Sequence, residues 1–237
     1  MKFTQYAKPQ VIMFSVMLLG EIMTVILLAV LLGCFVGGWI APFVTIAYAV
    51  FAIPIAAFLL AFFRDPDRKA DHEKIPGHVL VAPADGTVTE IKNIDDPRVG
   101  GPAVKIGIFL SIFNVHINRA PCLARVADVT YKSGEFLDAR DLDSSHRNEA
   151  NDLVLEPQEA HLHNLPFKLV VRQIAGKIAR RIVCEAKPGT VLNAGQRYGM
   201  IKFGSRTELI VPASPAPKIL VQLHQKVRAG NDFLVSY

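Results

Sequence analysis

The sequence predicts an α+β protein that is predominantly β: a barrel-sandwich-like soluble domain preceded by an N-terminal transmembrane or membrane-embedded helical hairpin. Two observations lead to this fold class. Residues 22–63 contain no charged side chain, and beyond them the chain consists of short β-type runs separated by Gly and Pro. We therefore expect two domains, a membrane-anchoring helical hairpin over residues 1–63 and a β-rich domain over residues 64–237.

The uncharged stretch is too long for a single membrane span. One straight helix over it would run about 63 Å at ~1.5 Å per residue, about twice the ~30 Å thickness of the hydrocarbon layer. Several Gly residues and Trp39 interrupt it between residues 33 and 39, so we expect two helices, over residues 11–32 and 40–63. Glu21 would face the partner helix or lie near one interface. The sequence leaves open whether the hairpin crosses the bilayer or is monotopic.

Positive charges lie at both ends of the hairpin and are absent from its turn. Lys2 and Lys8 precede the first helix, and Arg64, Arg68 and Lys69 follow the second. The positive-inside rule then places both ends, and the domain after residue 70, on the cytoplasmic face of the inner membrane. The net charge of +5 would favour anionic lipids. It forms no stripe of the kind that binds nucleic acid, so we expect no nucleic-acid partner.

The second part of the chain has a strand-like pattern. Seven runs are typical of strands: residues 78–82, 87–93, 104–110, 125–131, 167–173, 197–203 and 207–211. Residues 176–185 fit a short helix or a strand equally well. Charged residues, Ser, Asn and Pro gather over residues 138–151 and 156–166, where we expect long loops.

Two turn sequences in this part resemble each other, Pro-Ala-Asp-Gly-Thr-Val at residues 83–88 and Lys-Pro-Gly-Thr-Val at residues 187–191. Paired turns of this kind occur in barrel-sandwich modules similar to lipoyl or biotinyl carriers and membrane-fusion adaptors. A non-enzymatic membrane adaptor or carrier is therefore the alternative function. An adaptor would add a heptad-repeat hairpin and a carrier a Lys at a tight hairpin tip, and the sequence shows neither.

A Gly-Ser bond, Gly204-Ser205, lies between the last two strand-like runs. Self-cleavage there would require a base for the Ser205 hydroxyl, a carboxylate to orient that base, and an approachable Gly204 carbonyl. Gly204 supplies the last because it has no Cβ. His116, directly after an apolar run, is the candidate base, and Asp85, in an Asp-Gly turn, is the candidate carboxylate. Taken singly, each also has an ordinary structural explanation.

Five separated blocks of the chain resemble the phosphatidylserine decarboxylase family. They are residues 62–68, 83–88, 113–121, 173–184 and 203–212, in that order. The second block carries Asp85, the third His116 and the last Ser205. The run Phe-Gly-Ser-Arg at the cleavage site is similar to the short subtype, whereas longer bacterial members have Leu-Gly-Ser-Thr. Those members also have a second His where this chain has Phe113.

The resemblance implies a self-processing, pyruvoyl-dependent enzyme that converts phosphatidylserine to phosphatidylethanolamine and CO2. Residues 64–237 would form the catalytic domain, self-cleaved between residues 204 and 205, with His116 and Asp85 assisting. Ser205 would become a pyruvoyl group, the covalent cofactor, and no metal would be required. For Arg206, next to the reactive centre, we expect a substrate-binding role through charge-assisted hydrogen bonds; a surface strand cation is the structural alternative.

The resemblance also implies the partners of the protein. The substrate would be phosphatidylserine in an anionic membrane. The two chains produced by self-cleavage would stay bound to each other, and a homodimer is expected.

Overall fold

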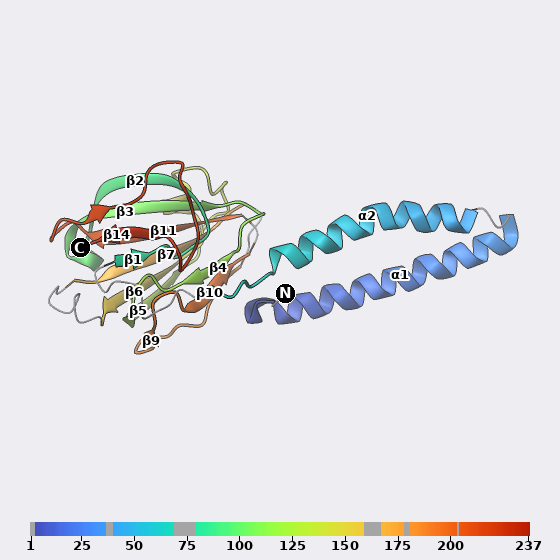
Figure 1. Cartoon of the computed structure of the whole chain (residues 1–237), viewed down its shortest axis with the longest axis horizontal. Helices are drawn as coiled ribbons and strands as arrows, with labels where there is room; N and C mark the ends of the chain where they lie inside the picture. The colour runs from blue at the N-terminus through green and yellow to red at the C-terminus, as the bar shows by residue number, and fades with distance from the viewer. Residues whose placement is uncertain (1–2, 37–39, 69–78, 159–166, 178–180, 203) are drawn as a thin grey trace. The chain divides into compact units, whose positions relative to one another are not determined.

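The computed structural model describes residues 3–36, 40–68, 79–158, 167–177, 181–202 and 204–237. It divides into two compact units, Met1–Pro66 and Asp67–Tyr237. The first is a helical pair and the second is almost entirely β (Figure 1). The predicted fold class is therefore confirmed.

The first unit is a hairpin of two long helices, α1 (Lys8–Val36) and α2 (Ile40–Phe62), after the short η1 (Gln5–Ala7). Two segments, Ile12–Leu31 and Pro42–Phe62, are long and apolar enough to cross a membrane. Helix α1 continues past the predicted break at Gly33, since one Gly costs a helix only about 1 kcal/mol. The expected turn at residues 37–39 lies outside the described residues.

Within the hairpin, the acidic residue of the first helix faces the second. The hydroxyl of Tyr48 donates to Oε2 of Glu21 at 3.3 Å. Large apolar side chains on both helices are otherwise exposed, among them Ile26 and Phe51. A surface of this kind on a long helix pair is stable in lipid rather than in water, which gives the chain its association with a membrane.

The second unit is built on a curled eight-stranded antiparallel sheet with the strand order β13-β2-β3-β11-β7-β6-β5-β9 (Figure 1). Its strands are β2 (Gly86–Asp96), β3 (Gly101–Leu110), β5 (Ala124–Lys132), β6 (Ala150–Pro157), β7 (Leu169–Ala175), β9 (Val191–Leu192), β11 (Ser205–Pro212) and β13 (Lys226–Val227). Strand β11 lies between β3 and β7, so both of its edges are hydrogen-bonded.

In the described part of this unit, two small sheets and two short helices accompany the large sheet. One sheet contains β1 (Val79–Val81), β14 (Phe233–Ser236) and β12 (Lys218–Ile219), and the other contains β4 (Ile117–Arg119), β10 (Arg197–Ile201) and β8 (Ile182–Cys184). The helices are η2 (Pro97–Val99) and α3 (Ser144–Arg147).

The predicted strands correspond to β1, β2, β3, β5, β7, β10 and β11. The sequence does not predict β6, because polar Asn151 and Asp152 lie at its start, between two expected loops. The ambiguous segment 176–185 contains β8, and the loop expected over 138–151 contains α3. Most of the loop expected over 156–166 lies outside the described residues.

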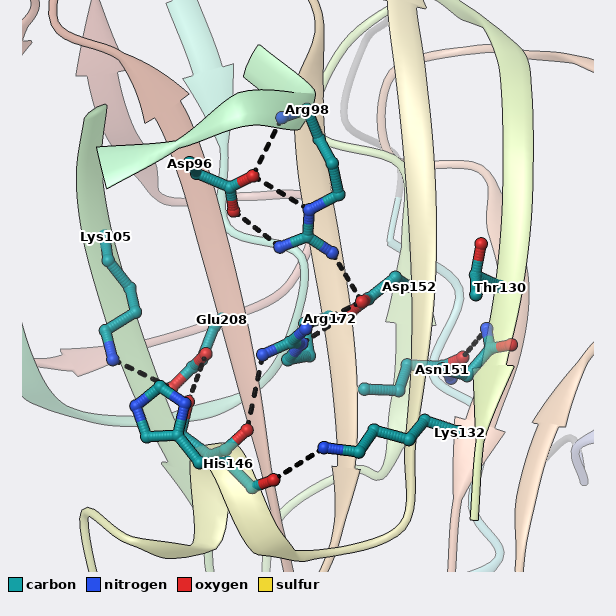
Figure 2. A network of polar contacts seen from close by, with 12 residues as sticks. Asp96, Arg98, Lys105, Thr130, Lys132, His146, Asn151, Asp152, Arg172 and Glu208 are labelled. Carbon is teal, nitrogen blue, oxygen red and sulfur yellow. Dashed lines mark hydrogen bonds and ion pairs between the residues drawn. The ribbon is translucent and has the colours of Figure 1, made fainter. Parts of the chain in front are cut away.

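The two faces of the large sheet differ in chemistry. One packs on the main apolar core, which includes Ile106, Leu153 and Leu209. The other carries charged side chains in a connected network (Figure 2). In it, Arg98 bonds the carboxylates of Asp96 and Asp152. Successive residues of a strand point to opposite faces, so each central strand supplies both surfaces.

Candidate active site

Ser205 is the first residue of β11 and is fully buried. It pairs with Leu110 on one side and with Ala175 on the other. Among the described residues, its Oγ has no hydrogen-bond partner. Leaving a buried hydroxyl unpaired costs about 1–3 kcal/mol, and such an atom in a native fold calls for a functional explanation.

Gly204 has a φ of +63°, which lies in the left-handed region that favours glycine. Its carbonyl lies directly against Gly176, just beyond the end of β7. A Cβ on Gly176 would be 2.2 Å from the Gly204 carbonyl oxygen and 3.1 Å from its carbon. Gly176 therefore leaves the room that the carbonyl of the Gly-Ser bond occupies.

The segment between α3 and β6 holds the end of β7, and with it Gly176, in position. The Asn148 side chain donates to the Ala175 carbonyl at 2.8 Å, and the Ala175 N–H donates to the Glu149 carbonyl at 2.9 Å. Asn148 also bonds the backbone of Leu137 in both directions. The position of Gly176 is thus set by a polar loop that the sequence predicts only as irregular.

His116 is fully buried, and its ring reaches Gly204, the residue before Ser205. Its Nδ1 lies 3.0 Å from the Asn114 carbonyl oxygen, and its Nε2 accepts the Gly204 N–H at 3.2 Å. A carbonyl can only accept, so Nδ1 carries the proton and Nε2 carries the lone pair. The ring is thereby held as a neutral base at the dipeptide Gly204-Ser205.

A chain of buried amides lies on the same face of the sheet as Ser205. Asn151 donates to Gln173 at 3.1 Å, Gln173 donates to Asn118 at 2.9 Å, and Asn118 donates to Thr207 at 3.0 Å. Asn118 lies two residues after His116, and Thr207 lies two residues after Ser205. The bond between them therefore fixes the segment of the base relative to the segment of the serine.

Asp85 lies in the turn before β2, in the wall of a cleft of about 590 Å³ that Ser111 and Asn114 also line. The guanidinium of Arg68 pairs with both of its carboxylate oxygens, and Oδ1 accepts the Ala229 N–H at 2.8 Å. The structure thus places Asp85 beside the loop that leads to His116 and pairs it with Arg68. The orienting role expected for Asp85 stays a prediction.

Arg206 lies on the sheet face opposite to Ser205 and is fully buried. Its Nε donates to Glu208 at 2.9 Å and its Nη1 to Thr89 at 3.1 Å, while Nη2 bonds Glu90. A surface strand cation, the structural alternative in the sequence, is therefore wrong. Substrate binding by Arg206 stays a prediction, and the structure gives its guanidinium protein partners.

Residues that the sequence does not single out also belong to the site: Arg68, Asn118, Gln173 and Gly176. All of them lie inside blocks that resemble the decarboxylase family. The blocks therefore locate these residues, while their contacts come only from the fold. Phe113, where longer bacterial members have His, is 72% exposed and lines the cleft.

The surroundings of Ser205 fit a pyruvoyl group. Conversion would replace its unpaired hydroxyl by a methyl group, which needs no hydrogen-bond partner in a buried position. Within the described ranges, no group of three or more His, Cys, Asp or Glu side chains is arranged to hold a metal ion.

Comparisons with known proteins give the family. The phosphatidylserine decarboxylase family model matches residues 55–235. The phosphatidylserine decarboxylase proenzyme of Rhodopirellula baltica is 42% identical over 221 residues, which are 91% of this chain and 84% of that protein. The proenzymes of Pelobacter propionicus and Chlorobium chlorochromatii are 42% and 40% identical over 78% and 87% of this chain, and over 79% and 92% of their own lengths. The chain belongs to the phosphatidylserine decarboxylase family.

Proposed function

We propose that this enzyme, a carboxy-lyase by family, converts phosphatidylserine to phosphatidylethanolamine and CO2 after it has cut itself between Gly204 and Ser205. The observation that carries the proposal is the buried, unpaired Oγ of Ser205 beside a glycine whose N–H is bonded to His116 Nε2. The relatives are named proenzymes, which supports a processing step. Membership of a decarboxylase family favours this function over an adaptor or carrier.

The first step moves the Gly204 acyl group from nitrogen to oxygen. Nε2 of His116 takes the Ser205 hydroxyl proton, and Oγ attacks the Gly204 carbonyl carbon. The C–N bond between the two residues breaks as the C–O bond forms, and the nitrogen takes the proton back. The product is an ester between Gly204 and Ser205 Oγ, with a free amine on residue 205.

The second step breaks the ester by elimination. A base, for which His116 is the candidate, removes the α-proton of residue 205, and the electron pair expels Oγ with the Gly204 carboxylate. The remaining enamine tautomerises and reacts with one water, which gives a ketone and ammonia. The oxygen of Ser205 thus leaves with the chain ending at Gly204, and the chain 205–237 begins with the pyruvoyl group.

Asp85 and Asn114 have separate roles in this proposal. The Asn114 carbonyl holds the neutral ring in the tautomer with its lone pair on Nε2. The carboxylate of Asp85 stabilises the imidazolium that forms as His116 takes the proton. Because Arg68 pairs with both oxygens of Asp85, this role depends on Arg68 as well.

The cleft beside Asp85 is the proposed site for the lipid headgroup. Lys226 and Arg228 line it, and their charges suit the phosphate and the carboxylate of phosphatidylserine. The pyruvoyl carbonyl, once formed, would supply the electron sink for loss of CO2. The helical hairpin would keep the enzyme at the membrane, and the cations at both of its ends favour the cytoplasmic face.

Intact mass spectrometry of the purified full-length chain tests the proposal. Two chains are expected, residues 1–204 and 205–237, the second with a blocked N-terminus that borohydride reduces. Mixed micelles of phosphatidylserine should then yield phosphatidylethanolamine and CO2. Active enzyme in one unbroken chain, with Ser205 unmodified, would overturn the proposal.

A further inference from the structure

The strand that begins at Ser205 becomes a chain terminus once the Gly204–Ser205 bond is cut. We propose that Arg206 is the positioning residue that holds this terminus in place in the cleaved enzyme, through a buried cluster on the sheet face opposite to the reactive group. The Arg206 cluster consists of Arg206, Glu208, Glu90, Thr89 and Lys105. The inference rests on the proposed function, because it concerns the state after self-cleavage.

Most contacts of the cluster join the two halves of the cut chain. Arg206 bonds Glu90 and Thr89, and Glu208 bonds Lys105 at 3.5 Å and Ser145 at 2.9 Å. Each of these partners precedes Gly204, so each contact would link chain 205–237 to chain 1–204. The bond between Arg206 and Glu208 lies within the short chain and orients both side chains toward the long one.

The centre of the cluster is shielded from solvent, while Thr89 and Glu90 at its edge are partly buried. Arg206 and Glu208 are fully buried, and Lys105 also pairs with Glu90 at 3.1 Å. Room for the guanidinium comes from Gly107, where a Cβ would be 2.2 Å from Nη2 of Arg206. Ion pairs with little access to solvent are screened little by salt and hold one geometry.

A shift in the register between β2 and β3 brings two hydrogen-bond partners to the guanidinium of Arg206. The pairing of β2 with β3 shifts between Val88 and Glu90. A bulge of this kind places two residues opposite one and re-aims their side chains. Thr89 and Glu90 both reach Arg206 here, on separate nitrogens.

Cleavage removes the covalent tether of residue 205, so other contacts must hold the new terminus. In the precursor, the peptide bond to Gly204 tethers residue 205 near His116. After cleavage, only the strand pairing and neighbouring side chains prevent the terminus from fraying. Arg206 is the residue next to the pyruvoyl position, and its side chain extends to the opposite face, so it can hold the terminus without occupying the reactive side.

The wider charged face supplies a matched control. Figure 2 shows Arg98 between Asp96 and Asp152, with Lys105 and Glu208 in the same network. Arg98 has carboxylate partners as Arg206 does, yet its partners lie in the same half of the cut chain. Replacing it should weaken the fold without affecting the new terminus.

The experiment compares Arg206→Met, Glu90→Gln and Arg98→Met with the wild-type full-length protein in detergent. The first two should still be cleaved to nearly the wild-type extent, because the precursor is tethered covalently. Their kcat per pyruvoyl group should fall about tenfold to a hundredfold, the loss that a displacement of ~1 Å of a reacting group causes. Arg98→Met should keep its kcat per pyruvoyl group.

Hydrogen exchange provides a readout that does not depend on activity. Amides of residues 206–209 should exchange faster in cleaved Arg206→Met than in cleaved wild type. The same substitution in an uncleaved Ser205→Ala background should speed their exchange less, because the peptide bond to Gly204 still tethers the strand. Glu90→Gln preserves shape and an acceptor for Arg206, and should give a smaller change in the same direction.

Three outcomes would overturn the inference: wild-type kcat per pyruvoyl group in both cluster variants, equal exchange effects in cleaved and uncleaved protein, or folded cluster variants that remain uncut. Absence of cleavage in the wild type would overturn the proposed function instead.

Discussion

The two faces of strand β11 carry side chains that differ in their hydrogen bonding at neighbouring positions. On one face, which also carries the amide chain, Ser205 has a buried hydroxyl without a hydrogen-bond partner in the described part of the chain. On the other, Arg206 and Glu208 are equally buried and bonded to opposite charges. Because successive side chains of a strand alternate, one rigid element can present an unsatisfied reactive group and a satisfied anchor side by side.

The difference separates side chains that define the position of β11 from side chains that raise the free energy of unfolding. Buried ion pairs often add no more stability than apolar residues of the same size, whereas removal of one partner is costly. The charged face therefore contributes mainly a defined position for β11. On the face of Ser205, by contrast, the side chains of Asn151, Gln173, Asn118 and Thr207 are hydrogen-bonded to one another, and the Ser205 hydroxyl is not part of that chain.

The largest effect is expected from Ser205→Ala, which removes the one unpaired hydroxyl of this comparison. Without Oγ no ester can form, so the chain should remain uncut and without activity. A denaturing gel and the intact mass measure this, and thermal unfolding should show a folded protein, because Ala leaves no buried polar group unpaired. Normal cleavage of this variant would refute the role of Ser205.

The next largest effect is expected from Gly176→Ala, which changes the reactive face without altering any reacting group. The added Cβ would be 2.2 Å from the Gly204 carbonyl oxygen, so the scissile carbonyl must move. A shift of ~1 Å should slow self-cleavage about a hundredfold, measured as the rate at which precursor disappears after synthesis.

A matched control for this glycine is Gly189→Ala. Gly189 has a φ of +88°, and no atom of the residues that the structure describes lies within 4 Å of an added Cβ, so the variant should lose some stability and cleave at the wild-type rate. If Gly176→Ala also cleaved at that rate, the contact with Gly204 would have no role in processing.

The amide chain beside Ser205 gives an intermediate effect. Gln173→Leu would leave the buried acceptor of Asn118 and the buried donor of Asn151 without their partner. Each unpaired group should cost about 1–3 kcal/mol of unfolding free energy, measured by urea unfolding of the uncut Ser205→Ala chain. The exposed Gln222→Leu should change it by no more than ~0.5 kcal/mol. Equal effects of the two would argue against a connected amide chain.

The sequence predicts the central strands of the large sheet and singles out the dipeptide Gly204-Ser205, but it does not predict the groups that hold them in place. Apolar alternation locates β3, β7 and β11, because a strand with a core face needs it. The sequence does not predict β6, whose Asn151 and Asp152 are polar because each takes part in a buried network on one face of the sheet. Unless their hydrogen-bond partners are known, polar residues of a strand favour the prediction of a loop.

Unknown partners also explain why the sequence does not predict the burial of Arg206. Its charge predicts either substrate contact or solvent, since a buried cation is rare without partners. The partners Glu90 and Thr89 lie more than a hundred residues away in sequence, and Gly107 makes the room. The residues next to Arg206 in the sequence indicate none of these contacts.

Arg98→Met tests the charged face away from the strand terminus. The exposed fraction of the Arg98 side chain is 32%, so we expect a loss of about 1–3 kcal/mol at pH 7, below the cost of a fully buried pair. Burial alone would raise the pKa of Asp96, but the hydrogen bonds and charge of Arg98 lower it overall. A lowered pKa stabilises the fold above the ordinary value of about 3.9 and less as pH falls through the folded value.

The stability difference between wild type and Arg98→Met should therefore be largest above about pH 5 and shrink below about pH 4. Urea unfolding across this range measures it. A difference that stayed constant with pH would show that packing of the Arg98 side chain, not its charge, provides the stabilisation.

The smallest effect is expected for an ion pair of the same type at the surface. Arg147 bonds Glu135 through two nitrogens, with exposed side-chain fractions of 55% and 53%. Water and salt screen such a pair, so Arg147→Gln should cost about 0.2–1 kcal/mol and less at 1 M salt. Arg206 has the same chemistry without solvent, so Arg206→Met in the uncut chain should cost several times more and depend little on salt. Similar losses of unfolding free energy at the two positions would mean that burial does not make the Arg206 ion pairs stronger than the surface pair.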